Sequence, residues 1–256
     1  MDMHADPTYG LSIFTGIGAN EISDLLKGGS VLRTEAGDRL FSKGQEAEFF
    51  GYVLSGAYKL TLQDPSNEEV IMHFGVRGES LGIMATMEGE SLYPFDAVAM
   101  WDSTFLAIPK KAFRTAWLNH PVVMNRYQTD LQGRIFRCLD EKRMGRRPLS
   151  ERTADLLLHL SDDKSSRSGK VEIPITRREI ASYVGATVES VIRNMAPWIQ
   201  SGIIQTASRQ IVIRDRKALI RVRAGDPDQQ NSARLKDRAT LASLWKRTRV
   251  SAFRAK

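Results

Sequence analysis

Residues 176–193 have the sequence TRREIASYVGATVESVIR, and this stretch decides how the carboxyl-terminal part of the chain folds. It predicts two short helices on either side of a tight turn at Gly185. Ala181 is small enough for the two helices to approach each other. Thr187 can cap the second helix by accepting a hydrogen bond from a free backbone N–H group. Two short helices joined by such a turn are typical of a helix-turn-helix.

The second of these helices has two unlike faces. At about 100° per residue, Val191, Met195 and Trp198 fall on one face. Glu189 and Arg193 fall on the opposite face. The apolar face can pack on its own domain, while the polar face presents a carboxylate and a guanidinium one turn apart. A helix that enters the DNA major groove needs groups of this kind on its outer side.

A plainer interpretation of Glu189 and Arg193 is an ordinary solvated pair, since residues four apart on a helix stabilise it by about 0.2–0.5 kcal/mol. The residues that follow favour the DNA interpretation. Two β-rich runs, 202–205 and 210–213, flank a turn that contains Arg209. A strand pair directly behind two short helices predicts a winged helix-turn-helix.

The composition is that of a globular protein with a basic balance of charge. The chain has 256 residues, 42% of them hydrophobic, with a formal net charge of +7 and a pI near 9.6. This length suggests one large or two modest domains, and the charge favours a polyanionic partner. No apolar run reaches the roughly 18 residues of a membrane span, and no secretory signal is visible. Because Cys138 is the single cysteine, no disulfide can form within the chain, and a cytoplasmic location is the default expectation.

Residues 29–108 are predicted to be all-β. Short runs rich in β-branched and aromatic residues alternate with turns that contain glycine, which argues for a sandwich or a barrel-like roll. From Val122 to Met144 the pattern changes, because there is no proline and a single glycine. One long helix is expected there.

The long helix carries an apolar stripe at steps of three and four residues, formed by Met124, Tyr127, Leu131, Ile135 and Cys138. Such a stripe is a candidate seam of a coiled-coil dimer. The alternative is a helix that packs on its own domain. The many charged residues beside the stripe favour the dimer.

The order β-roll, long helix and winged helix-turn-helix resembles the superfamily of bacterial transcription factors that contains the cyclic-AMP receptor protein and the fumarate–nitrate regulator. The resemblance covers about residues 11–222. Besides the helix-turn-helix, it rests on four runs: GDRLFSKG at 37–44, YVLSGAYK at 52–59, GESLG at 78–82 and ERTADLL at 151–157.

This resemblance implies an α+β fold and a homodimer that binds a two-fold symmetric operator in double-stranded DNA. It also implies four segments. These are a cyclic-nucleotide-binding-like β-roll for effector sensing at 11–118, a dimerisation helix and hinge at 119–147, a winged helix-turn-helix at 148–222 and a basic tail at 223–256.

The resemblance further implies which residues contact the operator. Arg193 donates to a guanine and Glu189 accepts from a cytosine, which reads the G·C pair of a TGA core. Val188 stands where the cyclic-AMP receptor protein has an arginine, and Ile192 replaces a serine of the fumarate–nitrate type and offers only apolar contact. The full expected set is Thr176, Arg177, Thr187, Val188, Glu189, Ser190, Ile192, Arg193 and Arg209.

The effector site departs from the pattern of cyclic-AMP binders in this family. Those carry a Gly-Glu-Leu triplet and then Arg-Ser or Arg-Thr, whereas the aligned residues here are Gly82-Ile83-Met84 and Tyr93-Pro94. The cyclic phosphate would lose its guanidinium partner, so cyclic AMP is not expected as the ligand. Core filling is the plainer role for Met84 and Tyr93. The candidate pocket residues are Gly82, Ile83, Met84, Ala85, Tyr93, Pro94, Arg137 and Cys138.

No cofactor and no metal are predicted. An iron–sulfur cluster needs about four thiolates, and the chain has one cysteine. His73 is the candidate haem ligand, but a single histidine in a β-run is more often structural. No metal-spaced cluster, nucleophile elbow or phosphate loop points to an enzyme.

Two further expectations concern partners. By resemblance, the polar loop 161–169 is a candidate contact for RNA polymerase, with a plain surface loop as the alternative. The segment 234–256 has eight Lys or Arg against one acid, so it is expected to add sequence-independent affinity for DNA. The alternative function for the whole chain is a ligand-sensing or scaffold protein with no specific DNA readout.

Overall fold

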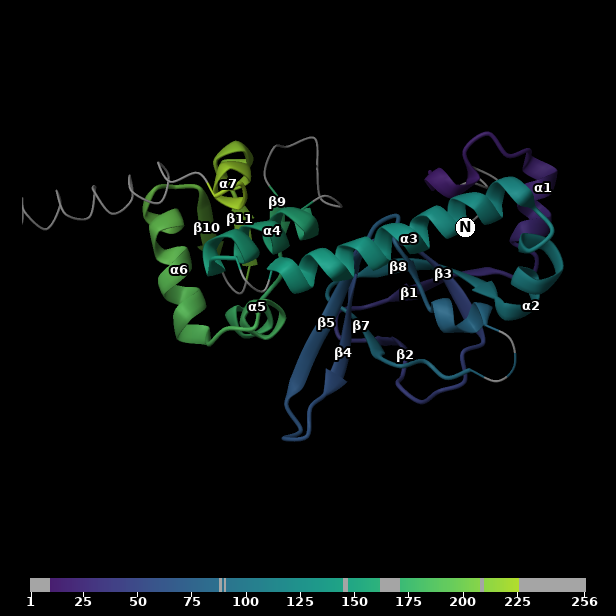
Figure 1. Cartoon of the computed structure of the whole chain (residues 1–256), viewed down its shortest axis with the longest axis horizontal. Coiled ribbons are helices and arrows are strands. Elements are labelled where there is room, and N and C mark those ends of the chain that lie inside the picture. Colours follow the sequence, from purple (N-terminus) through teal and green to yellow (C-terminus); the bar gives the residue numbers. More distant parts are fainter. Residues whose placement is uncertain are drawn as a thin grey trace, which may run out of the picture. The chain divides into compact units, whose positions relative to one another are not determined.

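The computed structural model describes residues 10–87, 89, 91–144, 147–161, 171–207 and 210–225. Figure 1 shows the chain with its helices and strands labelled. The chain divides into two compact units, Met1–Arg146 and Arg147–Lys256, called unit 1 and unit 2.

Unit 1 is built around two four-stranded antiparallel sheets, with strand orders β1-β8-β3-β6 and β2-β7-β4-β5. The predicted all-β roll is therefore confirmed. A 3-10 turn η1 (Ser12–Phe14) and helix α1 (Ala19–Leu25) precede the strands. The strands and the turn between them are β1 (Ser30–Thr34), β2 (Arg39–Phe41), β3 (Phe49–Ser55), β4 (Ala57–Gln63), β5 (Glu69–Val76), β6 (Ser80–Leu81), η2 (Ile83–Thr86), β7 (Asp96–Ala99) and β8 (Ser103–Pro109).

The tight connection between β3 and β4 depends on Gly56. Its φ is +84°, a left-handed conformation that side chains rarely adopt. A Cβ atom there would lie 2.0 Å from the Ser103 Oγ atom. That hydroxyl accepts a hydrogen bond from Ala57 N at 3.1 Å, so strand β8 closes against the turn. The glycine lets these backbones approach closely.

The core of unit 1 is rich in aromatic rings. The rings of Phe50 and Trp117 are both fully buried, with centroids 4.9 Å apart and planes at 86°. Phe113 and Tyr127 make further edge-on contacts with Phe50, at 5.4 and 6.0 Å. The Trp117 indole N–H donates to the Leu25 carbonyl at 3.0 Å, so the one polar atom of this ring has a partner. These contacts join the roll to the helices that follow it.

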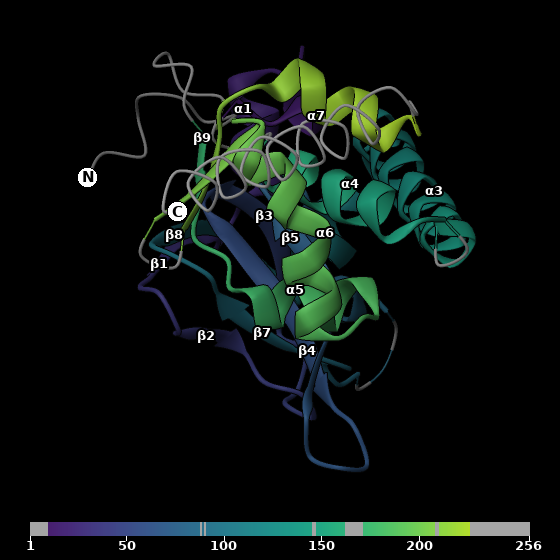
Figure 2. The ribbon, with the colours of Figure 1, turned by 90° about the vertical axis from the view of Figure 1, so that its left-hand side faces the viewer.

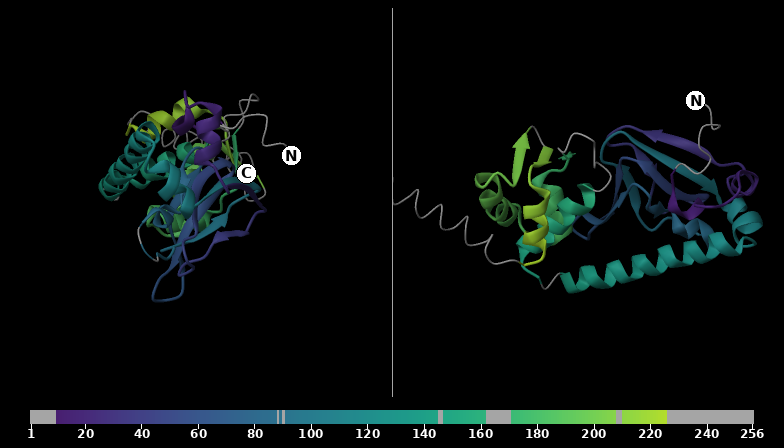
Figure 3. Two further views of the ribbon diagram at one scale, coloured as in Figure 1. Left: turned by 90° about the vertical axis from the view of Figure 1, so that its right-hand side faces the viewer. Right: turned by 90° about the horizontal axis from the view of Figure 1, so that it is seen from above.

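The chain leaves the roll through α2 (Lys110–Ala112), a π-helical turn η3 (Phe113–Trp117) and the long helix α3 (Pro121–Met144). Figure 3 shows α3 lying along one side of the roll. The predicted long helix is confirmed, but Tyr127 does not belong to an exposed seam. It is 2% exposed and packs in the core of its own unit together with Val123.

The apolar stripe of α3 therefore divides into two parts. Met124 and Leu131 are partly buried against the core of unit 1, whereas Ile135 is 61% exposed. Phe136 beside it is 66% exposed. The alternative of packing on the same domain describes the first half of the helix, and an uncovered apolar surface remains near residues 135 and 136. The side chain of Cys138 lies outside the described residues.

Unit 2 combines helices with a three-stranded antiparallel sheet of order β10-β11-β9. The predicted helix-turn-helix and strand pair are confirmed, while β9 and the last helix were not predicted. The elements are α4 (Leu149–Ser161), β9 (Val171–Ile173), α5 (Arg177–Val184), α6 (Val188–Gln200), β10 (Ile204–Ala207), β11 (Gln210–Ile213) and α7 (Arg216–Arg223).

Pro197 lies inside α6 and does not end it, although proline removes a backbone donor and should kink or end a helix at this point. The helix continues to Gln200, and the Pro197 carbonyl accepts a hydrogen bond from Ser201 N at 3.0 Å. The buried Trp198 next to it holds this last turn against the unit. Of the loop predicted to contact RNA polymerase, only Ser161 lies within the described residues, and the basic tail lies outside them.

We predict that Phe50→Ala destabilises the protein by about 3–5 kcal/mol, because it leaves a cavity among packed rings. Chemical denaturation would measure the free energy of unfolding. Leu92→Ala is the matched control, since Leu92 is 55% exposed and its loss should change stability by about 0.5 kcal/mol or less. Equal effects of the two substitutions would contradict this view of the core.

Candidate nucleic-acid interface and effector pocket

The first helix of the candidate DNA-binding motif, α5, begins with a capping box. Thr176 Oγ1 accepts a hydrogen bond from Glu179 N at 3.1 Å, and Glu179 Oε2 accepts from Thr176 N at 2.9 Å. The Thr176 hydroxyl also donates to the same carboxylate oxygen at 2.9 Å. Thr176 was predicted as one of the operator contacts. The structure gives its hydroxyl a structural task at the start of the helix.

The turn between α5 and α6 is fixed from two sides. Gly185 has a left-handed conformation, with φ at 65° and ψ at 53°, and Ala186 N donates to the Ala181 carbonyl at 3.0 Å. The Arg152 guanidinium, from α4, donates to the Val184 carbonyl. A cation at the carboxyl end of a helix also complements the helix dipole. Sequence reasoning predicted the glycine turn and missed the role of Arg152.

Helix α6 begins as predicted. Thr187 Oγ1 accepts from Ser190 N at 3.2 Å, and the two hydroxyls are 3.0 Å apart. Val191 and Met195 are fully buried and Trp198 is 5% exposed. The predicted apolar face of the helix is therefore the one that packs on unit 2. Figure 2 shows α5 and α6 with the turn between them.

The opposite face of α6 is open to solvent. Glu189 and Arg193 are exposed, and Ile192 between them is 52% exposed. Within the described residues neither the carboxylate nor the guanidinium has an ion-pair partner, so the two do not form the ordinary helix pair. These side chains are free to meet a ligand. Val188 and Ser190 of the same first turns are half-buried.

Two other predicted contact residues come from outside α6. Arg177 is half-buried at the start of α5, and desolvation by burial lowers the pKa of its guanidinium from the ordinary value. Arg209, which falls between β10 and β11 in the sequence, lies outside the described residues. A side-chain contact joins the ends of these two strands, since Arg214, directly after β11, donates from Nε and Nη2 to Gln205 Oε1 of β10 at 3.1 and 2.5 Å.

In the candidate effector segment, Tyr93 is a core residue. It is 1% exposed, its hydroxyl donates to the Phe49 carbonyl at 2.6 Å, and it accepts from Phe49 N at 3.2 Å. Its ring stacks on Phe41, with centroids 4.0 Å apart and planes at 13°. Burial raises the pKa of this phenol to about 12. The plainer interpretation of Tyr93 as core filling agrees with these contacts.

The rest of this segment wraps around the same strand. Gly82 has a φ of +75°, and a Cβ there would lie 2.8 Å from the Phe49 carbonyl oxygen. Ile83 and Met84 are half-buried, Ala85 is buried, and Pro94 is exposed. The structure thus brings residues 82–85 and Tyr93 together around Phe49. The side chains of Arg137 and Cys138 lie outside the described residues.

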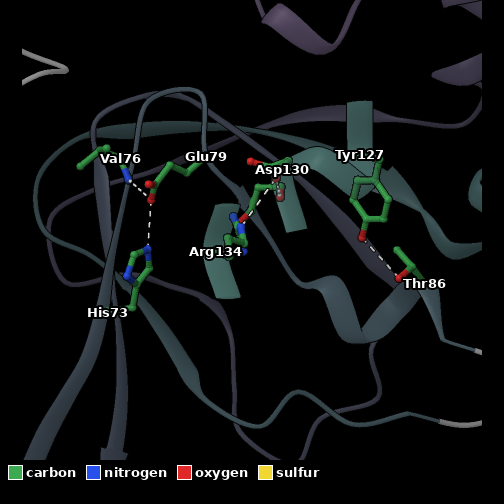
Figure 4. A network of polar contacts seen from close by, with 8 residues as sticks. His73, Val76, Glu79, Thr86, Tyr127, Asp130 and Arg134 are labelled. Atoms are coloured by element: carbon green, nitrogen blue, oxygen red, sulfur yellow. Dashed lines mark hydrogen bonds and ion pairs between the residues drawn. The ribbon is translucent and has the colours of Figure 1, made fainter. Parts of the chain in front are cut away.

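A polar network between the roll and α3 was not predicted from the sequence (Figure 4). Ser80 Oγ donates to Asp130 Oδ2 at 2.8 Å, and Asp130 lies 3.6 Å from Arg134 Nε. Arg134 also donates to the Ser80 carbonyl. The spacing of Asp130 and Arg134, four apart on a helix, was the one available signal, and it could not reveal Ser80 as the partner.

His73, considered above as a haem ligand, has a nearby acid as its partner. Its Nε2 atom lies 3.0 Å from Glu79 Oε2, and the same oxygen accepts from Val76 N at 3.4 Å. This contact fixes the turn between β5 and β6 (Figure 4). A structural role accounts for this histidine.

Both units match known protein families. Residues 31–120 match the cyclic nucleotide-binding domain, and residues 151–222 match the Crp-like helix-turn-helix domain. The chain is 27% identical over 214 residues to the transcriptional activator protein FnrA of Stutzerimonas stutzeri, covering 81% of this chain and 85% of that one. The chain belongs to the CRP/FNR superfamily of transcription factors.

A further relative and a solved structure are also similar to this chain. A probable transcriptional activator of Rhizobium leguminosarum bv. viciae is 26% identical over 200 residues, covering 74% of this chain and 80% of the relative. The solved structure of FixK2 from Bradyrhizobium japonicum has the same fold, with a TM-score of 0.64 at 23% identity. The structural match covers 76% of this chain and 96% of the FixK2 chain. None of the helices in the described ranges combines the length and the hydropathy that crossing a membrane requires.

For this CRP/FNR chain we predict that Gly185→Ala destabilises unit 2 by about 1–2 kcal/mol, because a side chain disfavours the left-handed conformation. Space is not the reason, since the nearest atom to an added Cβ is 4.0 Å away. Gly185→Asn is the matched variant, and it should cost less because asparagine tolerates this conformation. Thermal and urea unfolding measure both. Equal losses of stability in the two variants would show that the left-handed conformation at residue 185 is not the cause of the loss.

Proposed function

We propose that this chain is a homodimeric regulator that binds an inverted-repeat DNA operator through the outward face of α6. The observation that carries the proposal is the pairing of a fully buried face, Val191 and Met195, with an exposed face that holds Glu189 and Arg193. Because the buried face anchors the helix, the two charged groups point to solvent without partners among the described residues. Major-groove recognition requires this arrangement.

The chemistry of that face suggests a half-site. Arg193 donates two hydrogen bonds to O6 and N7 of a guanine, and Glu189 accepts from the amino group of a cytosine. Exposed Ile192 supplies an apolar contact to a thymine methyl group. We therefore propose a TGA-containing half-site, repeated about 34 Å along one face of the DNA as a dimer requires.

The residues around this face supply phosphate contacts in the proposal. Arg177 stands at the first turn of α5 and keeps its charge even though burial lowers its pKa, because the ordinary value of an arginine is far above neutral. Free backbone N–H groups at the start of α6 add donors for a phosphate. Wing residue Arg209 is the remaining candidate. These contacts orient α6 without reading sequence.

We also propose that cyclic AMP is not the effector. The position aligned with the phosphate-binding arginine is Tyr93, whose hydroxyl is already bonded to both polar backbone atoms of Phe49. A neutral phenol in this setting cannot replace a guanidinium for a cyclic phosphate. The side chains of the half-buried Ile83 and Met84 lack the carboxylate that would accept a hydrogen bond from a ribose hydroxyl.

In the proposed homodimer, the two copies of the chain contact each other through the uncovered part of α3. Since Tyr127 faces its own core, the seam shifts to a heptad pattern of Met124, Gln128, Leu131 and Ile135, at steps of four, three and four. Met124 and Leu131 are partly covered by unit 1, and Gln128 and Ile135 are exposed. Partner helices in a coiled coil cover such a stripe from the open side. RNA polymerase is the further partner that the family membership suggests.

We predict that Ile135→Glu weakens the dimer by about 1–3 kcal/mol or more, because the substitution places an unpaired charge in the seam. Sedimentation over a range of concentrations would measure the shift toward monomer. Gln132→Glu is the control, since residue 132 is exposed and lies off the heptad stripe. A monomeric wild type, or equal effects of the two variants, would contradict the seam.

We predict that Arg193→Ala weakens binding to the selected operator by about 1–3 kcal/mol and removes the preference at one guanine. Selection from random DNA, performed with wild type and variant, measures both quantities. Arg178→Ala is the control because Arg178 is exposed at the start of α5 and is outside the base-reading set, so it should change affinity without changing sequence preference. An unchanged guanine preference in Arg193→Ala would refute this readout.

A further inference from the structure

A pocket of unit 1 lies between the amino-terminal segment, the roll and α3, and none of residues 82–94 lines it. Its volume is about 380 Å³. It is lined by Ser12 and Ile13, by Tyr52 of β3 and Gly78, and by four residues of α3, namely Arg126, Thr129, Asp130 and Gly133. Pockets that hold small molecules have volumes of about 300–1,000 Å³. This one is large enough for a small organic ligand.

Tyr52, one of the residues that line this pocket, has an unusual hydroxyl. The residue is 3% exposed, and none of the described residues forms a hydrogen bond with the hydroxyl. The nearby Ser80 hydroxyl donates to Asp130 instead. Burial, and then the Asp130 charge, raise the pKa of the Tyr52 phenol well above its ordinary value. The smaller opposing effects of the Arg134 charge and the neighbouring Ser80 hydroxyl do not reverse this, so the phenol stays neutral. Buried polar groups normally have partners.

Of the two charged residues that line the pocket, the acid has an ion-pair partner and the arginine has none among the described residues. Asp130 is already paired with Arg134, at 3.6 Å from the Nε atom. Arg126 donates one N–H to the Ile13 carbonyl at 2.9 Å and has no carboxylate partner in the described part of the chain. A guanidinium carries five N–H donors, so most of those of Arg126 remain available. The pocket thus offers an uncompensated positive charge and a phenolic donor.

We infer that this pocket binds a small organic molecule through a carboxylate group. The carboxylate accepts hydrogen bonds from the Tyr52 hydroxyl and the Arg126 guanidinium, which satisfies both groups at once. Thr129 of α3 also lines the pocket, and its hydroxyl is placed to meet hydroxyl or amino groups on the remainder of the ligand. The site is separate from the candidate effector segment and does not depend on how α6 reads DNA.

The experiment uses the full chain and four carboxylate probes, namely acetate, succinate, benzoate and 2-oxoglutarate, with benzamide and succinamide as neutral analogues. Calorimetry and thermal shift measure binding at millimolar concentration. At least one carboxylate should bind the wild type, and the amides should not. Binding by the amides as strong as by the acids, or no binding by any of the four acids, would overturn the inference.

Variants then locate the site. Tyr52→Phe and Arg126→Gln should each weaken binding of the active carboxylate by about tenfold or more, since each removes one charge-assisted donor. Tyr58→Phe is the matched control, because the Tyr58 hydroxyl bonds to Thr34 at 2.8 Å and does not line the pocket. If the Arg126→Gln protein does not fold, the binding measured for Tyr52→Phe alone tests the site. That substitution removes only the hydroxyl and keeps the packed ring. If the affinity of the active carboxylate is unchanged in Tyr52→Phe, the inference is overturned. Operator binding by the wild type in the absence of carboxylate tests the proposed function separately.

Discussion

The burial of Val191, Met195 and Trp198 fixes which side of α6 meets solvent, and the DNA contacts proposed for unit 2 depend on it. Burying side chains of this size stabilises a fold by about 1.5–3 kcal/mol each, far more than an exposed charge pair could contribute. The cap at Thr187 and the left-handed turn at Gly185 then determine where the helix begins. A helix held in this way can keep a carboxylate and a guanidinium exposed without needing them for its own stability.

The long helix α3 packs against unit 1 through some of its residues and leaves others exposed. Val123 and Tyr127 pack into the core of unit 1, and Ser80, Asp130 and Arg134 tie the next turns to the roll. These contacts fix the rotation of the helix about its own axis. Fixed rotation is what leaves Ile135 and Phe136 uncovered on the outer side. The proposed dimer seam is thus a consequence of how the helix packs on its own unit.

Local patterns predicted most of the fold. The periodicity of residues 187–198 identified both faces of α6, and the glycine-punctuated runs of residues 29–108 identified the β-roll. What the patterns could not decide is which neighbour covers an apolar residue. Tyr127 fits a dimer stripe and a domain core equally well by spacing alone, and only the ring packing with Phe50 and Phe113 separates the two.

The candidate sites were less predictable than the fold, because contacts between distant residues define them. Thr176 carries the right chemistry for a phosphate, but its hydroxyl caps α5 through Glu179. Arg152 lies within the run 151–157, and its role at the end of α5 depends on how α4 and α5 pack together. The network at Asp130 likewise needs residue 80, fifty positions earlier in the chain.

Two buried tyrosines of unit 1 show how such contacts separate structure from function. Tyr93 donates to one backbone atom of Phe49 and accepts from the other, so its hydroxyl stabilises the fold directly. Tyr52 is equally buried, yet its hydroxyl has no partner among the described residues, and an unsatisfied buried group costs about 1–3 kcal/mol. A phenylalanine at residue 52 would keep the stacking on Trp117 and avoid that cost. Stability therefore does not account for the hydroxyl of Tyr52, and the ligand that we propose for this pocket would supply the missing acceptor.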